Sequence, residues 1–292
     1  MGKGEWGWFD LVALYTRLSK ETASIFLGLP SSGAVSMFGK NILILVPHPD
    51  DEVVMCGAAI GRAKAQGARV SALYLTNGCL DRPVLWPWQR KHHEERVQKR
   101  RAEAESAALF LGLTPVGWSD RPARHLWRNV SDVYAEVQKM MAVHRPDQVW
   151  VPAYEGGNPD HDALNALGAQ LKKGRSVLEF AVYTYFAARV QSQTFISWDE
   201  TARLFTLSPE ERRAKQKALD IYASERRNLS SLRVDQESYR PLAAYDYAQP
   251  PHQGTLWYNR FQWVPFRHPF IDRTSPADVS EEITAFLYRT TS

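Results

Sequence analysis

The segment from Pro47 to Glu52, with the sequence PHPDDE, holds the residue types that metal-assisted hydrolysis uses. Its two prolines fix their own φ angles and push the preceding residues toward extended geometry, so the polar side chains lie on a stiff loop. His48 and Asp51 can reach one cation, while Asp50 need not point the same way and can stay free as a base. A catalytic zinc site needs this division between ligands and a proton acceptor, together with an open position for water.

A second polar segment runs from Tyr154 to Asp162 with the sequence YEGGNPDHD. Its His161 is the natural third ligand for a cation held by His48 and Asp51. Two histidines and one aspartate suit zinc, and iron or cobalt would also fit. Taken alone, a histidine after a strand is usually structural, and an Asp-Asp pair usually starts a solvated helix. The presence of two such clusters favours a metal site.

Two buried strands are expected to bring these segments to one end of a sheet. The near-continuous apolar run Asn41–Val46 comes directly before PHPDDE, and the run Gln148–Pro152 comes directly before the second segment. Such runs are typical of strands buried on both faces of a parallel sheet. Ligand sites of open α/β sheets lie beyond the carboxyl ends of the strands. The two polar segments are therefore expected to face each other across the crevice of the sheet.

Strands and helices alternate along most of the chain. Ser208 with Pro209 and Glu211 forms a clear helix start, because serine caps, proline fits the first turn and glutamate completes a capping box. The alternation predicts a doubly wound, Rossmann-like α/β fold with a mostly parallel sheet and helices on both faces. Further strands are expected at 69–76, 115–118 and 178–186, and helices at about 52–66, 92–111, 131–144, from 160 onward and 208–224.

Residues 1–40 are expected to form an N-terminal helical extension, since apolar residues recur there at helical spacing. The extension is expected to pack against the domain, although its amphipathic pattern also fits a lid, a homo-oligomer contact or peripheral contact with a membrane. Residues 41–292 are expected to form a single catalytic domain. Its aromatic-rich part, 226–292, is expected to cover the sheet or to rim a site, with most of the aromatic residues after Trp257 in the core.

The composition excludes several classes of protein. Of the 292 residues, 44% are hydrophobic and 23% are charged, which is ordinary for a folded globular chain. The apolar runs are too short to span a bilayer, and the N-terminal segment does not read as a signal peptide. A formal net charge of +4 is too small to favour nucleic acid as a partner. Cys56 and Cys79 alone cannot build a disulfide scaffold or a cysteine zinc site, so a cytoplasmic location is expected.

Several motifs together resemble the PIG-L/LmbE family of zinc-dependent N-acetylglucosaminyl de-N-acetylases. The PHPDDE motif after the first strand and the NPDH element at 158–161 carry most of the resemblance. The turn at 76–78, the R-x-x-E helix that begins at Arg100, and the helix from Lys215 to Ser224 also resemble parts of the family pattern. The resemblance covers about residues 41–225.

This resemblance implies an LmbE-type fold and a zinc-dependent hydrolase of linear C–N amide bonds. His48, Asp51 and His161 would bind zinc, and Asp50 would be the general base. Zinc lowers the pKa of a bound water toward neutrality, and a nearby carboxylate can take its proton as the water attacks the amide carbon. The expected substrate is an N-acetylglucosamine-type sugar or conjugate, small or lipid-linked, and the products are acetate and a free amino sugar.

Asn158 departs from the family pattern, which usually has histidine at this position. By resemblance, that histidine acts as a cation that stabilises the oxyanion together with the aspartate at position 160. Asparagine can donate a neutral hydrogen bond but cannot carry charge, and charge-assisted bonds are about twice as strong as neutral ones. Three outcomes follow: Asn158 and Asp160 support a reduced activity, Tyr154 or His125 takes over, or catalysis is lost while the metal is retained.

Asn77, Arg100 and Asp120 are weaker candidates for contacts with sugar hydroxyls, the arginine and the aspartate by resemblance to the family. Glu52 is expected to cap its helix rather than to act in catalysis. Two alternative functions stay open. One is an amidase that removes a larger acyl group from an amino-sugar conjugate. The other is a metal-containing saccharide-binding protein without catalysis, which Asn158 motivates.

Overall fold

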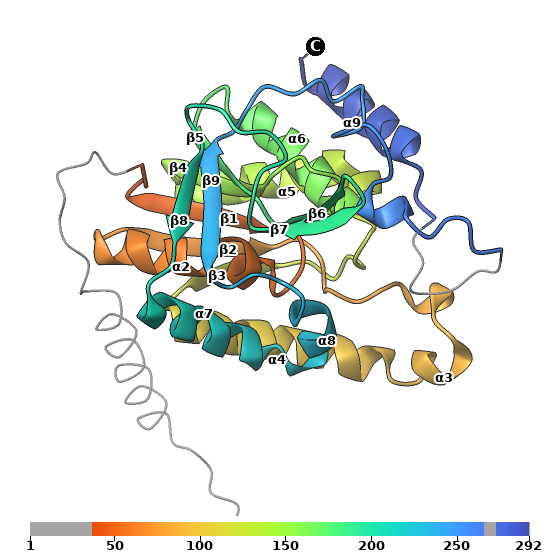
Figure 1. Cartoon of the computed structure of the whole chain (residues 1–292), viewed down its shortest axis with the longest axis horizontal. Coiled ribbons are helices and arrows are strands. Elements are labelled where there is room, and N and C mark those ends of the chain that lie inside the picture. The colour runs from red at the N-terminus through yellow and green to blue at the C-terminus, as the bar shows by residue number, and fades with distance from the viewer. Residues whose placement is uncertain (1–36, 266–272, 292) are drawn as a thin grey trace, which may run out of the picture.

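A central sheet with a layer of helices on each side forms the body of the protein (Figure 1). The computed structural model describes residues 37–265 and 273–291. The helix expected within the first 30 residues lies outside the described residues, so the N-terminal extension and the domain boundary at residue 40 stay predictions.

The main sheet has seven strands in the order β3-β2-β1-β4-β5-β9-β8, and a separate hairpin pairs β6 with β7. The strands are β1 (Asn41–Val46), β2 (Arg69–Tyr74), β3 (Thr114–Trp118), β4 (Gln148–Pro152), β5 (Ser176–Phe180), β6 (Tyr183–Phe186), β7 (Arg189–Ser192), β8 (Arg203–Thr206) and β9 (Gln236–Pro241). The first five strands pair in parallel, and β9 and β8 add an antiparallel edge. The predicted mostly parallel sheet is confirmed.

Helices cover both faces of this sheet, as the sequence predicts (Figure 1). On one face lie α2 (Asp51–Ala65), α4 (His93–Leu111), α7 (Pro209–Ile221) and the short α8 (Arg226–Leu229), and α3 (Pro87–Arg90) precedes α4. On the other face lie α5 (Val130–His144), α6 (Pro159–Leu171) and α9 (Pro276–Thr291). The capping box predicted at the start of α7 is present, because the side chains of Ser208 and Glu211 each accept a backbone N–H of the other residue.

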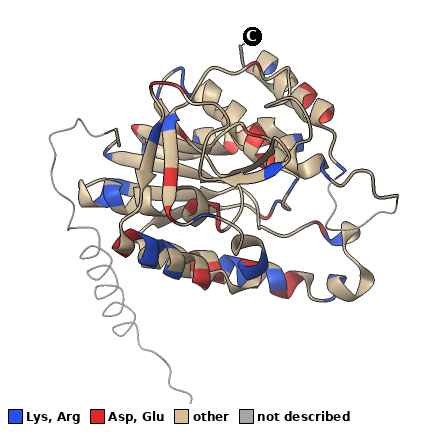
Figure 2. Ribbon diagram, viewed as in Figure 1, with Lys and Arg blue, Asp and Glu red and all other residues tan. Residues whose placement is uncertain are grey.

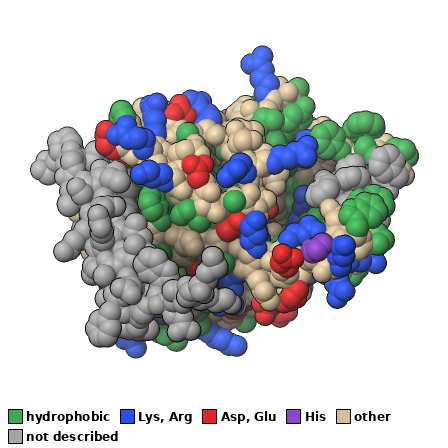
Figure 3. Space-filling model, turned by 90° about the horizontal axis from the view of Figure 1, so that it is seen from below, with side chains coloured by type: hydrophobic (Ala, Val, Ile, Leu, Met, Phe, Trp, Pro, Cys, Tyr) green, Lys and Arg blue, Asp and Glu red, His purple; other side chains and the backbone are tan. Residues whose placement is uncertain are grey.

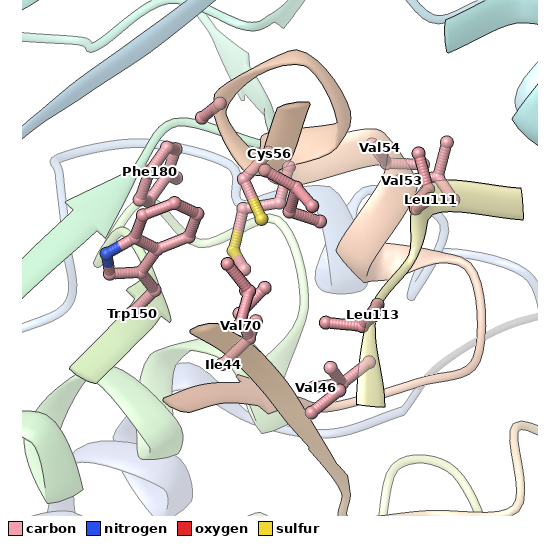
Figure 4. Packing of buried hydrophobic residues seen from close by; sticks show 14 of the residues in the cluster. Ile44, Val46, Val53, Val54, Cys56, Val70, Leu111, Leu113, Trp150 and Phe180 are labelled. Carbon is pink, nitrogen blue, oxygen red and sulfur yellow. The ribbon is translucent and has the colours of Figure 1, made fainter. Parts of the chain in front are cut away.

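The apolar run of β1 is buried on both sides of the sheet. Successive side chains of a strand point to opposite faces, and Ile44 and Val46 accordingly pack beneath α2, α4 and α7 (Figure 4). Leu43 and Leu45 belong to the other core cluster, which α5, α6 and α9 cover. An uninterrupted apolar sequence is therefore what this central strand requires.

The outer helices carry their charges toward solvent. The buried side of α4 consists mainly of alanine and leucine, and most of its charged side chains are exposed. Basic and acidic side chains alternate along α4 and α7 and are intermixed over the face seen from below (Figures 2 and 3). The described part of the chain has no helix long and apolar enough to cross a membrane. The cytoplasmic location stays a prediction.

The sequence prediction is wrong for the stretch 178–186. It forms two strands, because the chain leaves the main sheet after Ala181, whose N–H still donates to Ser238 on β9. The next residues pair with β7 instead, and the Thr184 hydroxyl donates to the carbonyl oxygen of Glu155 at 2.5 Å. The sequence analysis also did not predict the helix α9. It buries Ile283 and Phe286 in the core cluster that contains α6.

Candidate metal centre and active-site pocket

The two polar segments meet where the strand order reverses. β1 pairs with β2 on one side and with β4 on the other, and both polar segments leave the carboxyl ends of these central strands. Open α/β sheets bind ligands at such a switch point because the loops of neighbouring strands diverge there. The prediction that the two segments meet at one end of the sheet is confirmed by the topology.

The first segment turns sharply at Asp50, the N-cap of α2. Asp50 has a φ of 113°, a left-handed conformation that is costly for any residue except glycine. Its N–H donates to Glu52 Oε2 at 3.1 Å, and its carbonyl oxygen accepts from Val53 and Val54. These bonds hold a strained turn, and strained turns of this kind cluster at functional sites.

The second segment enters α6 through Asn158. The Asn158 Oδ1 accepts the N–H of Asp160 at 3.0 Å, and Pro159 occupies the first helical position. Both features are typical of stable helix starts. His161 therefore projects from the first turn of α6, where it is 2% exposed.

His48, Asp51 and His161 come together as a buried trio, and their ligand atoms all lie within 4.8 Å of one another. The Asp51 Oδ2 lies 2.9 Å from His48 Nδ1 and 3.0 Å from His161 Nε2. Ligand atoms that share a zinc ion at about 2 Å lie about 3.3 Å apart. The trio is thus spaced closely enough to hold a cation after small movements, and its donor set fits zinc, iron or cobalt.

The electrostatics of the trio also suit a cation. Burial lowers the pKa of His48, but hydrogen bonds to Asp160 and Asp51 outweigh burial and raise that pKa to about 10. Burial also opposes the charge of Asp51, yet His161 and His48 hold the pKa of Asp51 well below its usual range. Buried carboxylates that favour positive charge on a neighbouring imidazole create a field that a divalent cation would satisfy.

The Asp160 carboxylate serves His48 and two backbone N–H groups. The Asp160 Oδ2 lies 3.0 Å from His48 Nε2 and accepts the Arg124 N–H at 2.5 Å, and its Oδ1 accepts the Trp127 N–H at 3.2 Å. At a helix start, the N-cap side chain turns back to the backbone while the side chain two residues on points elsewhere. A carboxylate on the far nitrogen of a metal-binding histidine fixes its tautomer and orientation.

Asp50 lies beside the trio but makes different contacts. Its Oδ2 accepts from the Arg100 Nη2 at 3.2 Å, and the same nitrogen donates to the carbonyl oxygen of Pro49. Burial raises the pKa of Asp50 well above its usual value, Arg100 opposes this effect and Asp51 adds to it. Carboxyl groups with perturbed pKa values in such surroundings are candidates for proton transfer. Arg100 is 3% exposed, so its guanidinium serves Asp50 rather than an open surface.

Glu52 supports the turn at Asp50 from behind. Besides accepting the Asp50 N–H, its carboxyl group accepts a hydrogen bond from the Tyr222 hydroxyl through Oε1. Burial raises the pKa of Glu52 to about 7. The capping role expected for Glu52 agrees with these bonds, since its carboxylate satisfies a backbone donor at the helix start.

Asn77 and Asp120 hold a neighbouring loop together. The Asn77 Nδ2 donates to the carbonyl oxygen of Asp120 at 3.0 Å, and its Oδ1 accepts the Cys79 N–H at 2.9 Å. Thr76 ties this loop to the first polar segment through a 2.7 Å bond to the Pro47 oxygen. Because both polar atoms of Asn77 already bond to backbone, its role in this structure is to shape the loop. Asp120 is exposed at its surface.

A cavity of about 70 Å³ opens beside the second polar segment and has aromatic and basic walls. Tyr183 connects this cavity to the trio, because the centre of its ring lies 5.5 Å from that of His161. The Asn158 side chain and Tyr183 lie on the wall of the same cavity. Burial and the nearby Asp51 raise the pKa of Tyr183, so the phenol keeps its proton. The cavity is lined by Arg124, Gly157, Asn158, Tyr183, Trp257, Tyr258, Arg260 and Phe261.

Tyr183 is the site residue that the sequence analysis missed. A Cβ on Gly157 would lie 2.0 Å from the Tyr183 carbonyl oxygen, so only glycine allows β6 to approach the second segment this closely. The adjacent glycines 156 and 157 signalled a close approach by another segment. They carried no information about which segment approaches.

The Tyr154 hydroxyl is bonded to backbone in this structure. It donates to the Gln249 carbonyl oxygen at 2.7 Å, and the ring of Tyr154 packs against Tyr245 and Tyr247. The idea that Tyr154 or His125 takes over from the missing histidine stays a prediction.

Part of the aromatic C-terminal segment rims the cavity. The Arg260 guanidinium lies 3.8 Å from the centre of the Trp257 ring and 4.6 Å from that of Phe261. Tyr258 is buried in the core, as expected, but Phe261 is 45% exposed and Trp263 is 77% exposed. The prediction of core positions is thus wrong for these two residues, and the predicted rim is present.

The protein thus combines a mostly parallel α/β sheet with a His-Asp-His trio at its switch point. Residues 43–172 match the PIG-L family, described as GlcNAc-PI de-N-acetylase. This segment contains both polar segments and all three members of the trio. The resemblance inferred from the motifs is therefore confirmed over this segment.

Solved structures of low sequence identity share the fold. The deacetylase Dbv21, which acts on the A40926 pseudoaglycone, is 20% identical with a TM-score of 0.54, over 71% of this chain and 100% of that one. A deacetylase of the teicoplanin biosynthesis pathway is 19% identical with a TM-score of 0.55, over 70% and 99%. The zinc-inhibited teicoplanin deacetylase Orf2 is 19% identical with a TM-score of 0.53, over 70% and 99%. The predicted LmbE-type fold is confirmed.

Proposed function

We propose that the protein is a metal-dependent de-N-acetylase of an N-acetylated amino sugar or its conjugate. The observation that carries this proposal is the buried His48, Asp51 and His161 trio with the carboxyl group of Asp50, held by Arg100, at its side. The PIG-L match supports an amide hydrolase. The structural neighbours are named as deacetylases, which agrees with this class of reaction.

Zinc is the metal we propose, held by the trio. When bound, it would polarise the amide carbonyl and lower the pKa of a water molecule. Asp160 orients His48 through the ring nitrogen that faces away from Asp51. Arg100 and the strained turn fix the direction of the Asp50 carboxylate.

Asp50 moves the proton in this proposal. It accepts a proton from the attacking water and returns it to the nitrogen of the leaving amine, so that acetate and a free amine result. The raised pKa of Asp50 suits a group that must both hold and release a proton. The positive charge of a bound metal would lower this pKa and leave the carboxylate ready to act as a base before each turnover.

The acyl group is proposed to be acetyl because the adjoining cavity is small. Its volume of about 70 Å³ has room for only a few water molecules or a short acyl chain. The aromatic rim formed by Trp257 and Phe261 offers faces on which a sugar ring can stack.

Acetate release from a panel of N-acetylglucosamine conjugates tests the proposal. Zinc-loaded protein is expected to release acetate, and protein stripped with a chelator is expected to lose this activity and to regain it when zinc is added back. The same conjugates carrying longer acyl chains are assayed in parallel for comparison. Preferential release of a long chain would contradict the deacetylase and favour the alternative amidase.

The non-catalytic alternative gives a different pattern. Asn158 motivates it, and a saccharide-binding protein would bind zinc and glycan without releasing acetate. In that case the Asn158→His variant is assayed on the same panel. Activity in this variant alone would mean that the protein binds saccharides on a fold that has lost catalysis.

A further inference from the structure

We infer that Tyr183 is a catalytic residue whose hydroxyl group donates a hydrogen bond to the oxyanion of the tetrahedral intermediate, and that Asn158 positions this hydroxyl. The inference rests on the proposed function and adds a residue to it. Neither the PHPDDE motif nor the NPDH element contains a tyrosine.

The fold holds Tyr183 rigidly against the second polar segment. β6 begins at Tyr183, and the Thr184 side chain is bonded to the Glu155 carbonyl oxygen at 2.5 Å. Because glycine has no side chain at position 157, the Tyr183 backbone packs directly on the turn before α6. A hydrogen-bond donor contributes to catalysis only when it is held in place before the reaction, and this packing meets that condition.

The Tyr183 ring lies between the trio and the rim of the cavity. Its centre is 5.5 Å from the His161 ring on one side and 5.5 Å from the Trp257 ring on the other. The hydroxyl group is within electrostatic range of both Asp50 and Asp51. A substrate bound between this rim and the trio would therefore lie beside Tyr183.

Asn158 determines which way the Tyr183 proton points. The Asn158 Oδ1 accepts the Asp160 N–H at 3.0 Å, so its Nδ2 is the atom left to donate to Tyr183, which lines the same cavity. An amide nitrogen can only donate, and the Tyr183 oxygen therefore accepts this bond. The hydroxyl proton is left to point into the cavity, where it can serve a substrate oxygen.

This donor compensates for the histidine that the chain lacks at position 158. As the water oxygen adds to the amide carbon, the carbonyl π electrons move onto the carbonyl oxygen, which becomes negative. Asp50 takes the proton of the water, while Tyr183 keeps its own proton and only donates a hydrogen bond. When the C–N bond breaks, the charge leaves that oxygen and Asp50 returns the proton to the amine.

The Tyr183→Phe variant tests the inference directly. Removing one oxyanion donor costs about 100-fold in kcat, and we expect this loss with KM, zinc content and melting temperature unchanged. Tyr185→Phe, which removes a hydroxyl from the same strand, is the matched control and should keep normal turnover. Normal kcat in Tyr183→Phe would overturn the inference.

Asn158→Ser tests the positioning role, because serine still caps α6 but cannot donate to Tyr183. Alone it should lower kcat about tenfold, which corresponds to one hydrogen bond. In the Tyr183→Phe background the same change should lower kcat less than about twofold, since the two residues act as one unit. Losses that simply multiply in the double variant would overturn the positioning role.

Acetate release by the wild-type protein distinguishes a failure of the proposed function from a failure of the Tyr183 inference. If it releases no acetate from any conjugate, the proposed function and this inference both fail. If it is active and depends on metal while Tyr183→Phe is equally active, only the inference fails.

Discussion

Two clusters of buried charge contact α2, and they differ in how completely their charges are balanced. The catalytic cluster lies at the first turn of the helix and consists of His48, Asp50, Asp51, Asp160 and His161. The second cluster, called the kink cluster because it contacts a break in α2, lies further along the helix. It consists of Gln193, Lys215 and Glu237. Every one of these residues is at most 9% exposed, so burial alone does not distinguish them.

The kink cluster is complete in itself. α2 is not helical at Cys56, where φ is −145°, and this break frees backbone groups on both sides. The Val54 oxygen accepts from Lys215 at 2.9 Å and from Gln193 at 2.7 Å. Glu237 accepts the N–H groups of residues 58 and 59 at 2.8 and 2.9 Å and pairs with Lys215 at 2.7 Å. Its charges cancel, and the backbone groups at the break are satisfied.

In the catalytic cluster, by contrast, the chain does not balance all of the buried charge. It gathers three carboxylates around two histidines, and it raises the pKa of His48 to about 10 chiefly through hydrogen bonds to Asp160 and Asp51 that outweigh burial. Its His161 ring also lies beside Tyr183, which lines a cavity, whereas the kink cluster is buried beneath α7. A buried charge therefore indicates function where the opposite charge that balances it must come from outside the chain.

The largest expected effect is the loss of metal from the Asp51→Asn variant. Removing the charge at the centre of the trio should weaken zinc binding by more than about 100-fold and abolish metal-dependent turnover. Zinc content and calorimetric titration measure this effect. Asp162→Asn, at a buried aspartate in the first turn of α6 that accepts the Gly156 N–H, should retain zinc. Equal zinc affinity in both variants would show that the trio is not the metal site.

The Asp50→Asn variant is expected to separate binding from chemistry. Asparagine keeps the size of the side chain and the contact with Arg100 but cannot accept the proton of the water. Turnover should fall about 1,000-fold while zinc content stays normal, in the range found for general bases. Steady-state kinetics on metal-loaded protein measure the loss. Turnover at the wild-type rate would remove Asp50 from the reaction.

Lys215→Met breaks the other cluster and should act on stability instead. It leaves the Glu237 carboxylate buried without its cation, which costs about 3–5 kcal/mol of unfolding free energy. Denaturant titration measures this loss, and the molecules that remain folded should bind zinc with normal affinity. The Lys215→Met/Glu237→Gln double variant should recover part of the stability, because glutamine still accepts a backbone N–H but carries no charge. A double variant less stable than the single one would contradict this account.

The sequence could predict those site residues that follow directly from strand order. His48, Asp51 and His161 lie just beyond two apolar strands, and adjacent central strands deliver such loops to one point. Tyr183 could not be predicted in this way, because its place depends on where the chain leaves the sheet after Ala181. The direction of the Asp160 side chain depends on helix-start geometry and on the backbone of residues 124 and 127, which no motif encodes.

Glu155 is intermediate between the two clusters in how its buried charge is balanced. Its substitution is expected to have the smallest effect. It is 5% exposed, and its Oε1 accepts the Ile196 N–H at 3.2 Å. Burial and the nearby Glu179 raise the pKa of its carboxyl group from 4.5 to about 8, so a proton balances its charge. The folded state therefore binds this proton more tightly than the unfolded state, and the stability that it contributes is lost as pH rises from 4.5 to 8.

The Glu155→Gln variant carries no such proton and should escape this loss. Its melting temperature should be close to that of the wild type at about pH 4 and roughly 5 °C higher at about pH 9. Melting curves across this range measure the difference, and Glu210→Gln, at an exposed position, serves as the control with no pH-dependent gain. A gap between variant and wild type that stays constant with pH would mean that Glu155 is charged in the folded protein. Its charge would then be balanced by the chain, as in the kink cluster, and not by a proton.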